Sequence, residues 1–274
     1  MKRPETAGLF LPLQRELVAL LRGLSEADWS RPTVARGWTV KDVAAHLLDT
    51  DFRRLSMQRD GHRPSPKEFG GYEEIVAFIN QLNAAWVETA RRLSPRVLTD
   101  LLEWTGPQLA ELFASLAPDG DALYAVAWAG EGRSANWMDV GREYTEKWHH
   151  QAQIRDAVGA AALDSRRWLS PVIELSMYAL PHAFRATEAD EGGTLSVRVE
   201  GEAGGGWHIL RARGGWELRE GEREGASARV RLDADTAWRL FFNALGRDEA
   251  AARVEASGDE RLCETFLGVR SVMV

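Results

Sequence analysis

The sequence predicts a helical domain followed by a small α+β domain, because the spacing of its apolar residues changes near residue 187. Up to residue 187, apolar side chains recur every three or four positions, which is the repeat of an amphipathic helix. From residue 188 onward, short segments alternate apolar and polar residues between glycine-containing turns, which is typical of strands and hairpins. A chain of 274 residues with 45% hydrophobic content is long enough for two domains. We therefore expect domains at 1–187 and 188–274.

The helical part is predicted to begin with residues 4–24, whose leucines fall three or four positions apart. A second helix is expected from Thr39, because Thr39 and Asp42 have the spacing of a capping box. The third helix, over 72–93, has isoleucine, phenylalanine and tryptophan along one face.

Three further helices complete the predicted helical part. Ser94 followed by proline is a start signal for the first of them, which extends to residue 116 with an expected interruption at Gly106 and Pro107. The others are predicted over 137–159 and 168–185, where Pro181 is expected to kink or end the helix.

The C-terminal part is predicted to combine a sheet with two helices. Helices are expected over 235–245 and 259–269. Alternating apolar and polar residues predict strands at 194–201, 207–214, 216–221, 228–233 and 252–257.

Composition excludes several classes of protein. A net charge of −7 and a pI near 5.5 give no general attraction to nucleic acid or to an anionic membrane. The sequence has no apolar run of about 18 residues and no signal-peptide pattern, so we expect a cytoplasmic protein. Arginine greatly outnumbers lysine among the 34 basic residues, which indicates a GC-rich bacterial source. The single cysteine, Cys263, excludes an internal disulfide and is expected to be a buried structural thiol.

The helix predicted over 137–159 carries the most informative chemical pattern. Glu146 and His150 are four residues apart, so their side chains lie on the same face of a helix and can share one divalent ion. A solvated ion pair is the alternative interpretation, and zinc normally needs three or four ligands. His46, in the second predicted helix, fits either a third ligand or a hydrogen-bonded structural residue. The residues alone leave these alternatives open.

Two motifs together resemble a known family. They are GWTVKDVAAHLLD at 37–49 and the E-x-W-x-H pattern at 146–150. The chain resembles the DinB-like superfamily and, more narrowly, the mycothiol-dependent maleylpyruvate isomerase-like family. Its last segment, VEASGDERLCETFLGV, is similar to the sterol-carrier-protein-2-like domain that often follows in that family. The resemblance implies an α-helical four-helix bundle that binds metal, followed by a small α+β domain.

The resemblance also implies a set of metal ligands. In the family, a divalent ion is held by a histidine of the second helix and by a glutamate and a histidine of a later helix. These correspond here to His46, Glu146 and His150, with zinc the expected metal and nickel the alternative. The chain departs from the family at Gln153, where an aspartate is frequent, and at His149, which could replace or supplement His150.

The function implied by the resemblance is that of a metal-dependent enzyme. Such an enzyme uses a low-molecular-weight thiol, of the mycothiol or bacillithiol type, for transfer to or isomerisation of a small electrophilic substrate. Three protein ligands leave one coordination position open, as in catalytic zinc sites. The alternatives are a non-catalytic metal- or ligand-binding protein on the same fold and a zinc-hydroxide hydrolase. Whether the chain forms a homodimer is left open.

Four further residues are expected near the metal. Trp38 and Trp148 are predicted to contact the thiol cofactor, with core packing as the alternative role for both. Glu143 or Asp49 is expected to orient a ligand imidazole through a hydrogen bond. No catalytic residue is assigned from the sequence.

Overall fold

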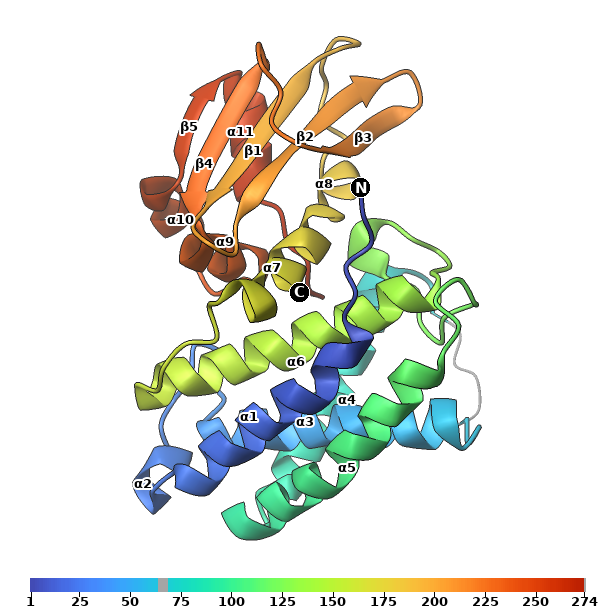
Figure 1. The fold of residues 1–274 in the computed structure, drawn as a ribbon, viewed down its shortest axis with the longest axis vertical. Coiled ribbons are helices and arrows are strands. Elements are labelled where there is room, and N and C mark those ends of the chain that lie inside the picture. The colour runs from blue at the N-terminus through green and yellow to red at the C-terminus, as the bar shows by residue number, and fades with distance from the viewer. Residues whose placement is uncertain (64–68, 274) are drawn as a thin grey trace. The chain divides into compact units, whose positions relative to one another are not determined.

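The predicted change from helices to strands is present in the computed structural model, which describes residues 1–63 and 69–273 (Figure 1). The chain forms two units. The helical unit comprises Thr6–Leu123 and Glu146–Ala162, and the sheet unit comprises Met1–Glu5, Tyr124–Thr145 and Leu163–Val274. Helix α6 (Asn136–Val158) contributes residues to both units. The predicted fold class is confirmed, while the domain boundary at residue 187 stays a prediction.

The helical unit is a bundle in which α1, α3, α5 and the second half of α6 pack together. Helix α1 packs against α5, and α3 packs against both α4 and α5. Lys147 of α6 donates a hydrogen bond to the Leu47 carbonyl of α3 at 3.0 Å, and Arg155 of α6 pairs with Glu16 of α1 at 3.2 Å. The elements are η1 (Ala7–Leu9), α1 (Phe10–Gly23), α2 (Glu26–Trp29), α3 (Val40–Arg54), η2 (Leu55–Arg59, a π-helical turn), α4 (Tyr72–Ala90), α5 (Pro95–Ser115) and α6.

The start of α3 is fixed by the capping box that the sequence predicts. The Thr39 hydroxyl accepts a hydrogen bond from the Asp42 backbone at 3.3 Å, and the Asp42 carboxylate accepts one from the Thr39 backbone at 3.0 Å. Two backbone donors that the first helical turn leaves without partners are thereby satisfied. His46 lies two turns further along α3, so the residue at which the helix starts also sets the face of the helix on which His46 lies.

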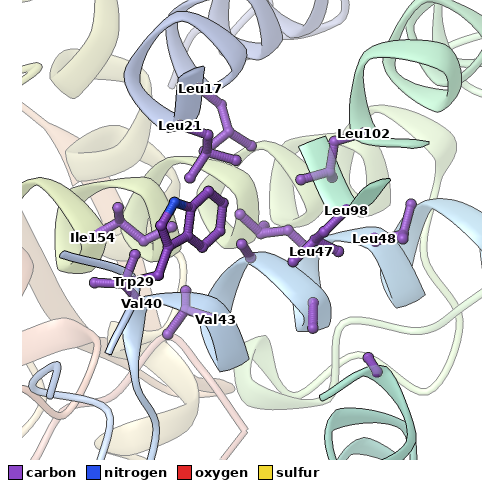
Figure 2. Close-up of a cluster of buried hydrophobic side chains, with 13 residues drawn as sticks. Leu17, Leu21, Trp29, Val40, Val43, Leu47, Leu48, Leu98, Leu102 and Ile154 are labelled. Carbon is purple, nitrogen blue, oxygen red and sulfur yellow. The ribbon is translucent and has the colours of Figure 1, made fainter. Parts of the chain in front are cut away.

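A cluster of apolar side chains holds these helices together (Figure 2). Trp29 lies among leucines from three helices, and Ile154 of α6 reaches the same cluster. Burial of apolar surface is the main driving force for packing, so this cluster fixes α6 against its neighbours. The labelled members are Leu17, Leu21, Trp29, Val40, Val43, Leu47, Leu48, Leu98, Leu102 and Ile154.

Helix α5 differs from its prediction, because it runs without a break through Gly106 and Pro107. Proline removes one backbone hydrogen bond from a helix, which is why an interruption was expected. Side-chain contacts from α1 and α3 hold the helix just before this point. Gln14 of α1 donates from its amide to the Leu102 carbonyl at 2.7 Å, and Thr105 donates to Asp51 of α3 at 2.6 Å.

The sheet unit contains a five-stranded mixed sheet in the order β3-β2-β1-β4-β5. Strands β1 and β4 pair in parallel, and the other neighbours pair antiparallel. Helix α9 packs against β1 and β4, and α11 packs against β4 and β5. The strands are β1 (Thr194–Glu200), β2 (Gly205–Ala212), β3 (Gly215–Glu220), β4 (Ala228–Asp233) and β5 (Glu255–Gly258). The other elements are η3 (Ala127–Ala129), α7 (Arg166–Met177), α8 (Leu180–Ala183), α9 (Ala234–Phe241), α10 (Arg247–Arg253) and α11 (Glu260–Leu267).

Two sequence expectations are met within the sheet unit. The helix predicted over 168–185 ends at Met177 and resumes as α8, with Pro181 in the first turn of α8. Cys263 of α11 is buried, and this burial raises the pKa of its thiol. A buried thiol of raised pKa is a structural residue rather than a nucleophile. No helix within the described residues is long and apolar enough to cross a membrane.

Candidate metal centre

The side chains of His46, Glu146 and His150 converge inside the helical unit. One potential ligand atom from each lies within 4.8 Å of the others. Helix α3 supplies His46, and α6 supplies Glu146 and His150 from successive turns of one face. Within residues 1–63 and 69–273, this is the one group of three histidine, cysteine or acidic side chains with such a spacing.

Gln153 sets the orientation of the His150 ring. The Gln153 amide oxygen lies 2.9 Å from Nδ1 of His150, and Nε2 of His150 lies 3.6 Å from a carboxylate oxygen of Glu146. Since an amide oxygen only accepts hydrogen bonds, the contact places the imidazole proton on Nδ1. The lone pair then lies on Nε2, on the side of Glu146, as in sites where an outer partner fixes the tautomer of a ligand histidine.

His46 carries a buried nitrogen that lacks a hydrogen bond. Its ring meets the His150 ring edge-on, with the two centroids 4.8 Å apart. Its Nδ1 is buried and has no hydrogen-bond partner among the described residues. A buried polar atom without a partner is costly, and coordination of a cation through this nitrogen would offset that cost.

Burial keeps both candidate histidines neutral at physiological pH. Burial, together with the neighbouring His149, lowers the pKa of His150 to about 3. Burial and the neighbouring His150 hold the pKa of His46 well below its usual value. Neutral imidazole is the form that binds metal. Two neutral imidazoles and one carboxylate match the ligand set of catalytic zinc sites, so the residues present fit a divalent cation.

His149 stands outside the converging group. Its ring packs against that of His150 at a tilt of 36°, with centroids 4.0 Å apart, and its side chain is buried. The structure therefore brings together the three ligands implied by the family resemblance, while the role of His149 beside His150 stays a prediction. That these three bind metal stays a prediction.

The two predicted tryptophans occupy different surroundings. Trp38 is half-buried, and its ring centroid lies 5.0 Å from that of His46 and 6.4 Å from that of His150. Trp148 is only 2% exposed, which is the burial of a core side chain. Of the two predicted tryptophans, Trp38 is therefore the one that lies beside the candidate metal ligands.

The predicted orienting carboxylates bind arginines. Asp49 pairs with Arg53 at 2.9 Å, and Glu143 pairs with Arg142 at 2.6 Å. The contact that orients His150 comes instead from Gln153, to which the sequence analysis gave no orienting role. Its position three residues after His150 was the signal, because such a side chain lies on the same helical face.

Residues 10–155 match the family described as the mycothiol maleylpyruvate isomerase N-terminal domain. The match covers more than half of the 274 residues and includes His46, Glu146 and His150. The chain belongs to this family.

Two proteins of Mycobacterium tuberculosis, from strains CDC 1551 / Oshkosh and ATCC 25618 / H37Rv, are similar to this family member and are both described as uncharacterized. Each is 31% identical over 174 residues. The aligned region spans 62% of this chain and 62% of the length of each relative.

Solved structures with the same fold include mycothiol-dependent maleylpyruvate isomerase and a histidine-to-alanine mutant of it. The TM-scores are 0.51 and 0.52, with 15% and 14% sequence identity. Each match covers 92% of this chain and 94% of the solved chain. At this identity the likeness concerns the fold, and it confirms the predicted order of a helical region followed by a small mixed-sheet domain.

Proposed function

We propose that this protein is a metal-dependent enzyme that uses a low-molecular-weight thiol of the mycothiol or bacillithiol type. Its reaction is the transfer of that thiol to a small electrophilic substrate, or the isomerisation of such a substrate. The observation that carries the proposal is the convergence of His46, Glu146 and His150 within 4.8 Å. Zinc is the metal we expect, with nickel as the alternative.

The ligand set is that of a catalytic rather than a structural site. Three protein ligands leave a coordination position open, whereas structural zinc sites use four. A divalent ion bound here would lower the pKa of a thiol or water bound to it and so supply a nucleophile near neutral pH. His46 and His150 provide neutral nitrogen donors, and Glu146 offsets part of the charge of the ion.

An external thiol suits this chain better than its own cysteine. Cys263 is buried and its pKa is raised, so it offers little thiolate at neutral pH. Trp38, beside both histidines, is the aromatic surface against which the thiol would pack. Trp148 remains the second predicted contact, although its burial favours a core role.

Metal content of the purified protein tests the site directly. We expect near-stoichiometric divalent metal in the parent, measured by elemental analysis, and its loss in His46→Ala and His150→Ala. His62→Ala is the matched control, because His62 is exposed and lies outside the converging group. A parent that contains no metal and takes up neither zinc nor nickel would refute the enzyme proposal.

Turnover with and without thiol tests the reaction class. Maleylpyruvate with mycothiol is the first pair to offer, since it is the pair named for the solved structures of the same fold. We expect turnover that requires both the metal and the thiol. Turnover that continues without thiol would indicate a hydrolase, and a metal-loaded protein with no thiol-dependent reaction would indicate a binding protein.

A further inference from the structure

A buried ion pair joins α3 to α6 beside the candidate metal centre. Nζ of Lys147 pairs with one carboxylate oxygen of Asp51 and donates a hydrogen bond to the Leu47 carbonyl at 3.0 Å. Thr105 of α5 donates to the other carboxylate oxygen of Asp51 at 2.6 Å. The side chains of Lys147 and Asp51 are 5% and 0% exposed. Three helices therefore meet at a single buried carboxylate.

A gain in folding free energy does not explain why this buried pair is present. Taking two charges out of water costs about as much free energy as their attraction returns, so apolar residues of similar size often replace such a pair without loss. What the pair provides is a fixed position of α6 relative to α3. Lys147 reaches two oxygen atoms of α3 at once, and both contacts require one particular placement of α6 along α3.

The placement matters because the metal ligands are divided between the same two helices. His46 directly precedes Leu47, whose carbonyl Lys147 binds, and Glu146 directly precedes Lys147. The hydrogen bond thus joins the immediate chain neighbours of two ligands from different helices. A slip of α6 by one residue would move Glu146 by about 1.5 Å along the helix axis relative to His46. Such a slip would break both contacts of Lys147.

We propose that Asp51 and Lys147 are positioning residues that fix the register of α6 against α3 and thereby the spacing of His46 from Glu146 and His150. The expected effect of this pair on metal binding rests on the proposed function. The pair makes no contact with substrate in this scheme and acts only through the ligands. Thr105 supports it by holding the Asp51 carboxylate from α5.

The test replaces both charges at once, in Asp51→Leu with Lys147→Met, because a single substitution would leave one buried charge unpaired. The measurements are the Tm of the metal-free protein, the zinc Kd by chelator competition, and the visible spectrum after Co²⁺ loading. We expect a Tm near that of the parent, a Kd raised about 10-fold or more, and an altered Co²⁺ spectrum. The control is Arg22→Ala with Asp100→Ala, an exposed pair between α1 and α5, which should change neither the Kd nor the spectrum.

A second variant covers the case in which the double substitution prevents folding. Thr105→Val is close to isosteric and removes one hydrogen bond to Asp51, so we expect the zinc Kd to rise roughly 5-fold. A folded double variant with the Kd and Co²⁺ spectrum of the parent would overturn the inference, as would an unchanged Kd in Thr105→Val.

Crystal structures of the metal-free parent and double variant separate this inference from the proposed function. We expect the His46 and His150 ring centroids, 4.8 Å apart in the parent, to be displaced in the variant. Unchanged ring positions would overturn the positioning role. A parent that binds no metal would refute the proposed function, and the ring positions would still decide the role of the pair.

Discussion

Nδ1 of His150 lies 2.9 Å from the side-chain oxygen of Gln153, one turn later on α6. Because both residues belong to one helix, the contact is set by local geometry and does not depend on how other elements pack. It holds the His150 ring so that Nε2 faces Glu146 at 3.6 Å. An amide in this position takes the part that a carboxylate or backbone carbonyl takes in many metal sites.

Loss of this contact should weaken metal binding. In Gln153→Leu the His150 ring loses its acceptor, and we expect the zinc Kd to rise about 10- to 100-fold. Gln153→Glu keeps an oxygen at the same place and should bind zinc at least as tightly as the parent. Competition with a chelator of known affinity measures both. A Kd in Gln153→Leu equal to that of the parent would show that this contact does not orient the ligand.

The sequence predicted the features of the site that depend on residues a few positions apart. It missed the features that depend on packing between helices. The Thr39–Asp42 cap is a local pattern, and the spacing of Glu146 and His150 indicated one helical face. His46 needed the family resemblance, because nothing local separates a ligand from a structural histidine.

Long-range contacts account for the rest. Asp51 and Lys147 are 96 positions apart, and no periodicity links them. The continuity of α5 through Pro107 likewise depends on neighbouring helices, such as the contact of Gln14 with the Leu102 carbonyl. Local preference is a weak guide where tertiary contacts of this kind oppose it.

Asp42 should make the stability of the protein depend on pH under acidic conditions. Burial of the carboxyl would raise the pKa of Asp42, but hydrogen bonds from Arg91 and Thr39 outweigh it and lower this pKa. Arg91 Nε lies 3.0 Å from the carboxylate. Because the folded pKa lies below the unfolded value of about 3.9, the charged carboxylate stabilises the fold above that value. This contribution is lost as the pH falls through the folded pKa.

Asp42→Asn tests this dependence. Near pH 7 we expect the variant to be less stable than the parent by up to about 1 kcal/mol, because asparagine carries no charge to pair with the half-exposed Arg91. The difference should begin to shrink as the pH falls below about 4, because the unfolded parent then takes up a proton while the folded carboxylate is still charged, and it should vanish once the folded carboxyl is protonated too. Urea unfolding at several pH values gives both curves. A difference that stays constant from pH 7 to pH 3 would contradict the assigned role of the charge.

Gln151 is a buried amide whose replacement should stabilise the helical unit. Its side chain is 1% exposed, and neither amide atom has a hydrogen-bond partner among the described residues. An apolar side chain of similar length removes that cost, so Gln151→Met should raise the free energy of unfolding by about 1–3 kcal/mol. Denaturant unfolding measures the change. A loss of stability would instead indicate an ordered water bound by the amide, in a cavity of about 10 Å³ that Gln151 lines with Lys147 and Gln14.

Gly106 should tolerate no side chain while Gln14 is present. A Cβ added at Gly106 would lie 2.2 Å from Cγ of Gln14, whose amide is held by the Leu102 carbonyl at 2.7 Å. Alanine is otherwise favoured over glycine within a helix by about 1 kcal/mol. The clash opposes that preference, and we expect it to prevail, because the Gln14 side chain can move only by giving up a buried hydrogen bond.

A double-mutant cycle separates the two effects. Gly106→Ala alone should lower the free energy of unfolding by about 1–3 kcal/mol, as other overpacked core substitutions do. Adding Gln14→Ala removes the atoms that clash, so the double variant should be more stable than the sum of the single changes predicts. Thermal and urea unfolding of all four proteins give the coupling. Additive changes would mean that Gln14 moves aside freely, and that Gly106 is required by something other than its approach to α1.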